Sequence, residues 1–224
     1  MTPVSWPCPL PGGGTALEHA VVADAGQPCR LLIVPALFDE GNRLRRFSVE
    51  VMRRLAGAGI DSFLPDLPGC NESLQPLDRQ EPVDWQDAMV AAARHFGATH
   101  ALGIRGGCMF TPAQLLKWHY APIKAASIVR QMLRARILSA REAGREETRE
   151  QLSELALASG IELAGYRLGA NFYRHFESMA PDPGAALITQ EALGGSGLWL
   201  RAEPDEDAAQ ADALASLLTR ALTA

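Results

Sequence analysis

Short apolar runs alternate along the first half of the chain with longer segments in which apolar residues recur every three or four positions. The runs Arg30–Val34, Ile60–Leu64 and His100–Ile104 are too short for helices and fit buried strands. The segments between them, roughly 43–58 and 85–96, have the spacing of amphipathic helices. Strands and helices that alternate in this way predict a mostly parallel, twisted α/β sheet flanked by helices, with right-handed crossovers.

Polar residues mark the expected start of each of these helices. We expect Asn42 to cap the helix Arg43–Ala58 and Asp84 to cap the helix Trp85–Phe96. Short polar side chains at such positions accept a hydrogen bond from the first free N–H groups of a helix.

The two ends of the chain complete the predicted sheet. Residues 1–14 are rich in proline and glycine and predict an extended N-terminal arm, and Thr15–Ala23 predicts an edge strand. Leu198–Ala202 is interpreted as the last strand. A C-terminal helix is expected to begin after the acidic residues Asp205–Asp207, where negative charge suits the helix dipole.

The middle of the chain predicts one further strand and a helical insertion. Leu115–Pro122 is the strand, and residues of about 124–180 form the insertion or lid region. Its expected helices are Lys124–Arg141, Glu146–Ala158 and Asn171–Met179. We find no linker long enough to divide the chain, so we expect residues 1–224 to form a single domain.

Composition and charge exclude several functional classes. Hydrophobic residues make up 47% of the chain and charged residues 21%, as in an ordinary globular protein. The net charge of −5 gives no basis for electrostatic binding to nucleic acid or to an anionic membrane. The longest apolar run is too short to span a bilayer, and the N-terminus lacks the pattern of a secretory signal.

The four cysteines are scattered, without a Cys-x-x-Cys pair. We therefore interpret them as reduced thiols of a cytoplasmic protein. No spacing of histidines, cysteines or acidic residues is typical of a metal site, and we expect neither a metal nor a cofactor.

The most informative segment is Gly103–Gly107, which directly follows a predicted strand. In α/β-hydrolases this place holds the motif Gly-x-Ser-x-Gly, whose serine sits on a sharp, strained turn. Here the central residue is Arg105, whose guanidinium stays protonated and cannot attack a carbonyl. The catalytic histidine expected near the C-terminus is also missing, because no histidine follows His175. We interpret His175 as a packing residue of a helix.

Six segments, in order, extend this similarity. They are Pro35–Arg43, Asp66–Ser73, Gly103–Gly107, Trp118–Pro122, Arg130–Arg136 and Ala164–Tyr166. Together, over residues 30 to 205, they resemble the exosortase A system-associated hydrolase 2 family of α/β-hydrolase-like proteins. The resemblance implies an α/β-hydrolase fold and a link to exopolysaccharide production and protein sorting in Gram-negative bacteria. The family pattern is altered at Asn71, where a glycine is usual, and the helix after Gly107 looks much shortened.

Arg105 has two interpretations. The loop after the preceding strand of the sheet carries Asp39, Glu40 and Asn42, so Arg105 can form a buried ion pair with Asp39 or Glu40. Alternatively, Arg105 and these neighbours bind a small anionic or carbohydrate-type ligand, such as an acidic sugar, because a guanidinium beside a helix N-terminus favours an anion.

Three residues are weaker catalytic candidates. Cys108 would need a lowered pKa and a nearby base to act as a nucleophile, and the alternative is an inert buried thiol. Glu40 is a candidate general base, alone or together with His119, and surface or ion-pair roles compete with this hypothesis.

Two functions remain open at this level. The first is a hydrolase-fold protein without serine-hydrolase activity that serves an exopolysaccharide or exosortase system by binding a ligand or as an accessory protein. The second is an enzyme with a rearranged site that acts on an ester or acyl group of a polysaccharide precursor. A third hypothesis, an oligomerisation module built on the helical insertion, has less support.

Overall fold

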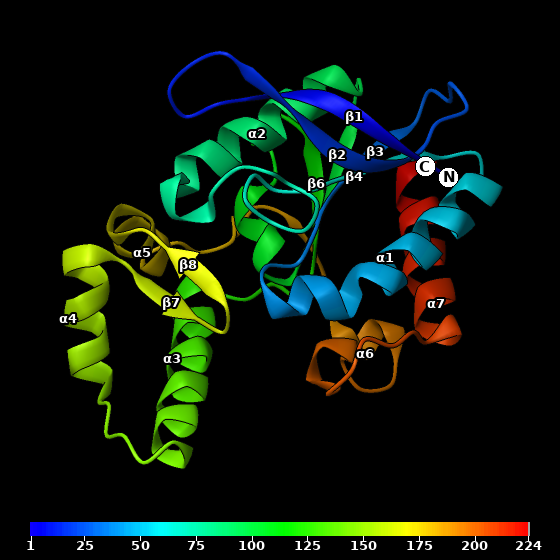
Figure 1. Ribbon diagram of the computed structural model, residues 1–224. Helices are drawn as coiled ribbons and strands as arrows, with labels where there is room; N and C mark the ends of the chain where they lie inside the picture. Colours follow the sequence, from blue (N-terminus) through cyan, green and yellow to red (C-terminus); the bar gives the residue numbers. More distant parts are fainter. Residues whose placement is uncertain (224) are drawn as a thin grey trace.

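The apolar runs predicted as strands form the centre of a seven-stranded sheet in the computed structural model, which describes residues 1–223. They are β3 (Arg30–Val34), β4 (Asp61–Pro65) and β5 (His100–Ile104), and β3 pairs in parallel with both of the others. The strand order is β1-β2-β4-β3-β5-β6-β9 (Figure 1). The predicted mostly parallel sheet flanked by helices is confirmed.

The N-terminal segment differs from its prediction. Residues predicted as an extended arm form β1 (Thr2–Pro9), which pairs antiparallel with β2 (Thr15–Ala23) along its whole length. The edge-strand prediction for Thr15–Ala23 is therefore wrong, because β2 lies between β1 and β4.

The opposite edge of the sheet also corrects the sequence interpretation. β6 (Leu116–Tyr120) pairs with β5, and the last strand is β9 (Ala186–Ile188). Leu198–Ala202 is not a strand, because Leu198–Leu200 forms a single 3₁₀ turn. Only Leu198 of that apolar triplet is fully buried, and Leu200 is 72% exposed, so the triplet lacks the burial of a central strand.

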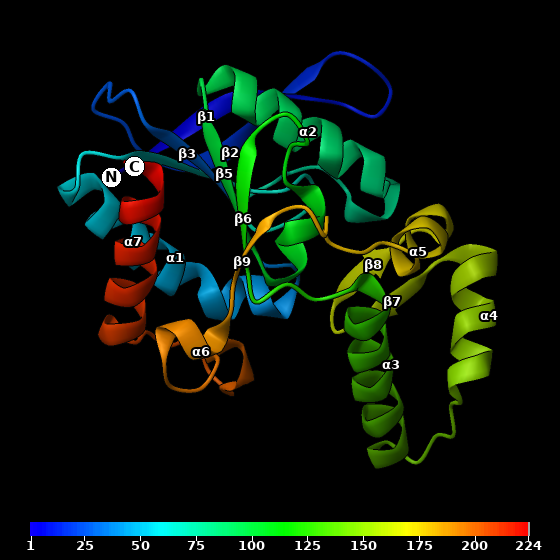
Figure 2. The same cartoon turned by 180° about the vertical axis from the view of Figure 1, so that it is seen from behind.

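Helices cover the two faces of the sheet (Figures 1 and 2). On one face, α1 (Asp39–Gly57) packs beside α7 (Ala208–Leu222), over an apolar core that includes Phe47 and Tyr120. On the other face, α2 (Pro82–His95) covers a second core with four aromatic side chains in contact with one another. These are Trp85, Phe110, Phe172 and Phe176.

Both predicted helix caps are wrong by about one turn. α1 begins at Asp39, with Phe38 at the cap position, and Asn42 instead donates a hydrogen bond from Nδ2 to the Tyr166 hydroxyl. α2 begins at Pro82 after Glu81, and Asp84 lies in its first turn, where its carboxylate accepts from the Glu81 N–H. Proline is well suited to the first turn of a helix because its missing N–H would have no partner there.

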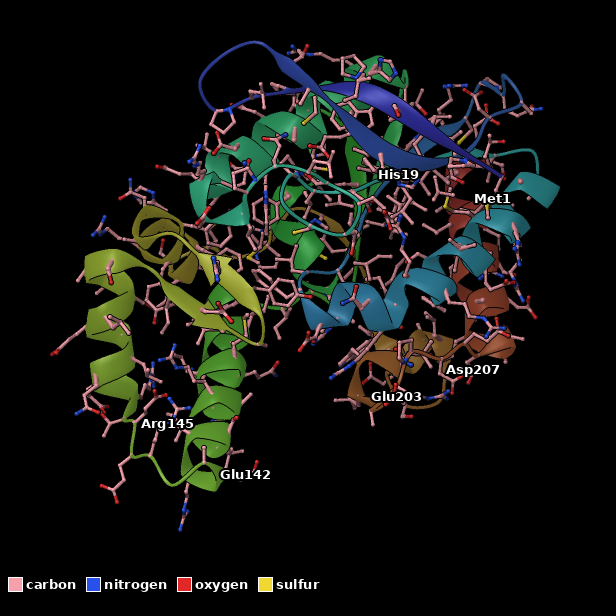
Figure 3. All side chains as sticks on the ribbon, in the orientation of Figure 1. Met1, His19, Glu142, Arg145, Glu203 and Asp207 are labelled. Atoms are coloured by element: carbon pink, nitrogen blue, oxygen red, sulfur yellow. The ribbon has the colours of Figure 1, made fainter. Side chains whose placement is uncertain are left out.

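The segment predicted as a helical insertion contains three helices and a small hairpin. They are α3 (Ala125–Glu142), α4 (Arg149–Ser159), the strands β7 (Ile161–Leu163) and β8 (Tyr166–Leu168), and α5 (Ala170–Glu177). α3 and α4 extend away from the sheet, and Glu142 and Arg145 lie at the far end of this arm (Figure 3).

Three short helical elements complete the fold. They are α6 (Gln190–Leu193), a 3₁₀ turn at Leu77–Arg79 and a 3₁₀ turn at Arg105–Phe110. Within residues 1–223, no helix combines the length and the apolar character that crossing a membrane requires.

Candidate functional site

A sharp turn follows β5, and Arg105 is its first residue. The backbone of Arg105 has a φ of 54°, which L-amino acids rarely adopt. The flanking glycines are required by close packing: a Cβ on Gly107 would lie 2.2 Å from the carbonyl oxygen of Pro35. A Cβ on Gly103 would lie 2.6 Å from Cα of Cys108. The 3₁₀ turn that begins at Arg105 replaces a regular helix, which agrees with the shortening expected from the sequence.

The Arg105 side chain forms a bidentate ion pair with Glu40. Its Nε and Nη2 donate to the two carboxylate oxygens of Glu40 at 3.0 and 2.9 Å. Nη1 donates to the carbonyl oxygen of Ala121 at 2.9 Å, and the guanidinium carbon lies 4.1 Å from the ring centre of Trp199. The side chains of Arg105 and Glu40 are only 10% and 15% exposed. Of the two predicted ion-pair partners, Asp39 and Glu40, it is therefore Glu40 that contacts Arg105.

The start of α1 places Glu40 opposite Arg105. The helix begins immediately after the β3 loop, so Asp39 and Glu40 occupy its first turn, where carboxylates are stabilised by the helix dipole. Asp39 is exposed, whereas Glu40 is largely enclosed. The turn is tight, since a Cβ on Gly41 would lie 2.6 Å from the carbonyl oxygen of Ala36.

Four strands of the sheet are followed by a non-glycine residue with positive φ. They are Phe38 after β3, Asn71 after β4, Arg105 after β5 and Ala121 after β6. The carboxyl ends of parallel strands meet at one edge, so these residues gather there. Backbone strain of this kind is retained where the surrounding structure demands it, and it is concentrated at functional sites.

A cavity of about 350 Å³ opens above the Arg105–Glu40 ion pair. Ligand sites in proteins are typically concave, largely apolar and equipped with a few polar groups, and this cavity has that character. The residues that line it are Leu37, Phe38, Asp39, Glu40, Arg43, Arg105, Ile128, Gln131, Met132, Ala135, Ala164, Trp199 and Leu200.

Comparison with solved structures identifies the architecture. A protein from Agrobacterium vitis S4 proposed to be a hydrolase superposes with a TM-score of 0.64, at 12% identity, over 99% of this chain and 98% of its own. Alpha/beta hydrolase domain-containing protein 10 from mouse superposes with a TM-score of 0.58, at 10% identity, over 100% of this chain and 99% of its own. The chain has the α/β-hydrolase fold. An esterase domain from Rhodothermus marinus is also similar, with a TM-score of 0.53, 9% identity and coverage of 98% and 97%. No protein-family model and no curated protein matches the sequence.

In the α/β-hydrolase fold, the residue at the turn after β5 is the usual position of the nucleophile. Arg105 occupies it here, with the strained backbone that the fold requires. The guanidinium has no lone pair to attack with, and three of its N–H groups are already bound.

The structure does not bring His119 to Glu40. His119 shares a hydrogen bond of 3.0 Å between its Nε2 and the Thr111 hydroxyl, and it lines a separate cavity of about 290 Å³. Burial and, secondarily, the nearby Lys117 lower the pKa of His119 below its ordinary value. Successive residues of a strand face opposite sides of a sheet. Tyr120 lies on the side of Trp199, so the preceding His119 faces away from Arg105.

Cys108 lies within the 3₁₀ turn that begins at Arg105 and is 1% exposed. Its thiol is 3.9 Å from the carbonyl oxygen of Tyr120. Burial raises the pKa of Cys108 far above its ordinary value, and this outweighs the opposing effect of Arg105. A thiol that stays protonated is a poor nucleophile, so this environment fits the inert alternative.

Two residues of the site were missed by sequence reasoning. Trp199 stacks on Arg105, and Arg43 donates from Nη1 to the Trp199 carbonyl oxygen at 2.9 Å. Trp199 is distant in sequence and lies in a segment interpreted as a strand, so no local pattern pointed to it. Arg43 directly follows the acidic segment, and that adjacency was the available signal.

A second polar centre lies at the same edge, after β4. Asp66 is completely buried and accepts hydrogen bonds from Arg45 at 2.5 Å, Asn71 at 3.0 Å and, through Nδ1, His19 at 3.1 Å. Figure 3 labels His19 on β2. No local sequence pattern marks this centre, because its residues come from three separate segments.

Neither centre has the composition of a metal site. Within residues 1–223, no three side chains of His, Cys, Asp or Glu gather in a way that would hold a metal ion. Each carboxylate in these centres is instead matched by arginine.

Proposed function

We propose that this α/β-hydrolase-fold chain binds a ligand without serine-hydrolase activity, as an accessory protein of an exopolysaccharide or exosortase system. The observation that carries the proposal is the Arg105–Glu40 ion pair, which occupies the tip of the turn where acyl chemistry needs a hydroxyl. The link to exopolysaccharide rests on the sequence resemblance over residues 30 to 205.

The surroundings of Arg105 support the loss of hydrolysis. A serine-type mechanism needs a nucleophile, a histidine base in contact with it and an acid that orients the histidine. His19 is bound to Asp66, and His119 is bonded to Thr111. No histidine is among the residues that line the cavity within the described part of the chain.

The lining charges indicate which ligand suits the cavity. Asp39 and Glu40 are balanced by Arg43 and Arg105, so the lining has no net charge. Glu40 already accepts two hydrogen bonds from Arg105, and a phosphate would have to displace it. Hydroxyl groups can bond to carboxylates, guanidinium groups and amides alike. A hydroxyl-rich, carbohydrate-type ligand therefore fits better than a multiply charged anion.

Absence of turnover is the first test. We expect no labelling by a fluorophosphonate and no hydrolysis across a panel of acyl esters. Arg105→Ser should also remain inactive, because the new hydroxyl would have no histidine beside it. Robust turnover by the natural protein that is abolished in Glu40→Gln or Cys108→Ala would instead support the alternative function, a hydrolase with a rearranged site.

Ligand preference is the second test. Calorimetric titration with glucose, glucuronate and glucose 6-phosphate should show binding of the first two and weaker binding of the phosphate. Asp39→Asn and Arg43→Gln should weaken sugar binding about tenfold, since each removes a charge-assisted hydrogen bond. Arg130→Gln is the matched control, because Arg130 is exposed on α3 and does not line the cavity. Preferential binding of the phosphate, lost in Arg105→Ala, would contradict the uncharged-ligand proposal.

A further inference from the structure

The cavity above Arg105 has one polar wall and one apolar wall. The polar wall comes from the start of α1 and the turn after β5, with Asp39, Glu40, Arg43 and Arg105. The facing wall comes mainly from α3, and its only polar lining side chain there is Gln131. The apolar lining residues beside it are Ile128, Met132 and Ala135 of α3, together with Ala164. The charged lining side chains thus come from α1 and the turn after β5, and none of them comes from α3.

The wall formed by α3 continues beyond the cavity and ends in an exposed leucine. Ile128, Gln131, Ala135 and Leu138 follow one another at spacings of three and four, so they share one face of the helix. Leu138 is 60% exposed, one turn outside the cavity. From residue 128 to residue 138 the helix rises about 15 Å. We refer to these four residues as the α3 stripe.

The opposite side of the opening also carries an exposed apolar side chain. Leu200, in the 3₁₀ turn next to Trp199, lines the cavity and is 72% exposed. Figure 1 shows α3 on one side and the segment around α6 on the other, with the start of α1 between them. An exposed leucine on each side of the opening provides apolar surface that a bound aliphatic group could remove from water.

We propose that the ligand is an amphiphile, with a hydroxyl-rich head on the polar wall and an aliphatic tail along the α3 stripe. This inference rests on the proposed function, whose cavity it shares. A single small sugar would leave the apolar wall exposed to water, whereas a tail of about 15 Å would cover it out to Leu138. The polar wall ends at the largely buried Arg105–Glu40 pair, which fits a small head group, and the exposed Leu138 marks where the tail leaves the cavity.

The test compares glucose with n-alkyl glucosides of increasing chain length, each below its micelle concentration. Affinity measured by calorimetry should rise about threefold per methylene as the chain grows along α3, and then level off. Ala135→Glu places a charge in the apolar wall and should remove most of this gain. Leu138→Glu should make the gain level off at a shorter chain. Leu155→Glu is the matched control, since Leu155 is an exposed leucine on α4 outside the cavity.

The outcomes separate this inference from the proposed function. Equal affinity for glucose and for every alkyl glucoside would overturn the proposed tail site on α3 and leave the proposal of sugar binding intact. No binding of any glucoside or of glucose would reject the proposed function, and the amphiphile with it. If affinity still rises with chain length in Ala135→Glu, the alkyl chain adsorbs non-specifically. The same conclusion follows if Leu155→Glu abolishes the rise as fully as Ala135→Glu does. A dimer that Leu138→Glu dissociates, without any alkyl-chain gain, would assign the stripe to contacts between copies.

A photoreactive alkyl glucoside gives an independent readout of tail position. With a diazirine at the end of the chain, cross-links should fall on the α3 peptide that contains Ala135 and Leu138. Excess octyl glucoside should compete them away. Cross-links confined to β6 and β9, where Leu116 and Leu187 are exposed, would overturn the proposed path of the tail.

Discussion

Two arginine–carboxylate centres lie at the carboxyl edge of the same sheet, and they differ in what covers them. After β5, Arg105 holds Glu40 in a bidentate pair beneath a cavity of about 350 Å³. After β4, Arg45 holds Asp66, which His19 and Asn71 also contact. Asp66 has no exposed surface, and the void lined by the following loop residues Leu67 and Asn71 measures only about 10 Å³.

The difference shows that an arginine–carboxylate pair by itself does not imply an adjoining cavity. Both centres pair a guanidinium with a carboxylate that is largely removed from water. Asp66 accepts hydrogen bonds from Arg45 on α1, from His19 on β2 and from Asn71 in its own loop. These bonds connect α1 and β2 to the end of β4. The Arg105 centre is bordered by open space, and only there can a ligand approach the charged groups.

The largest expected effect is loss of the guanidinium at Arg105. Arg105→Met leaves the Glu40 carboxylate without its cation while only 15% of its side chain is exposed. We expect the free energy of unfolding to fall by about 3 kcal/mol, because an unpaired charge in such surroundings is costly. The double variant Arg105→Met/Glu40→Leu should recover most of the loss. Denaturation in urea measures both, and a loss below about 1 kcal/mol in Arg105→Met would show that the pair is effectively solvated.

The same change at the second centre should cost less. In Arg45→Met, Asp66 keeps the hydrogen bonds from His19 and Asn71, so we expect a loss of about 2 kcal/mol. Sugar binding should be unchanged, since none of these residues lines the cavity above Arg105. Arg46→Met is a control on the same helix, because Arg46 is 63% exposed and should contribute little. Weakened sugar binding in Arg45→Met would mean that the two centres are coupled.

His119 provides a smaller test through the pH dependence of stability. Its pKa is lowered below the ordinary value of 6.5, so the unfolded chain binds its proton more readily than the folded chain. Stability from this residue is therefore complete above about pH 6.5 and decreases as the pH falls below it. Urea denaturation between pH 7 and pH 5 should show a shallower decrease for His119→Gln. A residual decrease is expected from His100, whose pKa burial also lowers. An unchanged slope in His119→Gln would contradict this account.

The smallest expected effect is a change in the alkylation rate of Cys70, near Asp66, compared with that of Cys108, near Arg105. Burial, together with the charges of Asp66 and Glu18, raises the pKa of Cys70 to about 12. Cys70 is a half-buried residue, and its thiol should react slowly with iodoacetamide at pH 8. Asp66→Asn should speed this reaction about two- to threefold. Cys108 should stay unreactive in both proteins, because it is 1% exposed. Mass spectrometry of native samples measures both sites. Equal acceleration at Cys108 would indicate general loosening of the fold instead of a local charge effect.

The central strands and the site's main contact could be predicted from the sequence because their signals are local. β3 and β5 occupy the residues predicted, since short apolar runs followed by a turn leave few alternatives. The sequence places Arg105 between glycines directly after β5. The order of the strands then predicted an acidic partner in the loop after β3. The choice between Asp39 and Glu40 depended on where α1 begins, and the sequence misplaced that start at Asn42.

The edges of the sheet depended on pairing between distant segments. Pro3, Pro7 and Pro9 argued against a strand in the first residues, yet β1 accommodates them because it is an edge strand with only one neighbour. β9 is a strand of three residues, two of them exposed, and carries almost no hydrophobic signal. Trp199 reaches Arg105 from the far end of the chain through a turn that no local pattern marks.

The glycines around Arg105 have a consequence for how such proteins are found. Gly103 and Gly107 are fixed by the close approach of backbone atoms, and that contact does not depend on which side chain stands between them. A search that demands the serine would pass over this chain, whereas a search for the paired small residues after a buried strand, with the middle position left free, would retrieve it. The two glycines thus indicate the fold, and the residue between them indicates which chemistry the turn can support. Genomes screened by the first criterion alone will undercount chains that keep this turn with a different central residue.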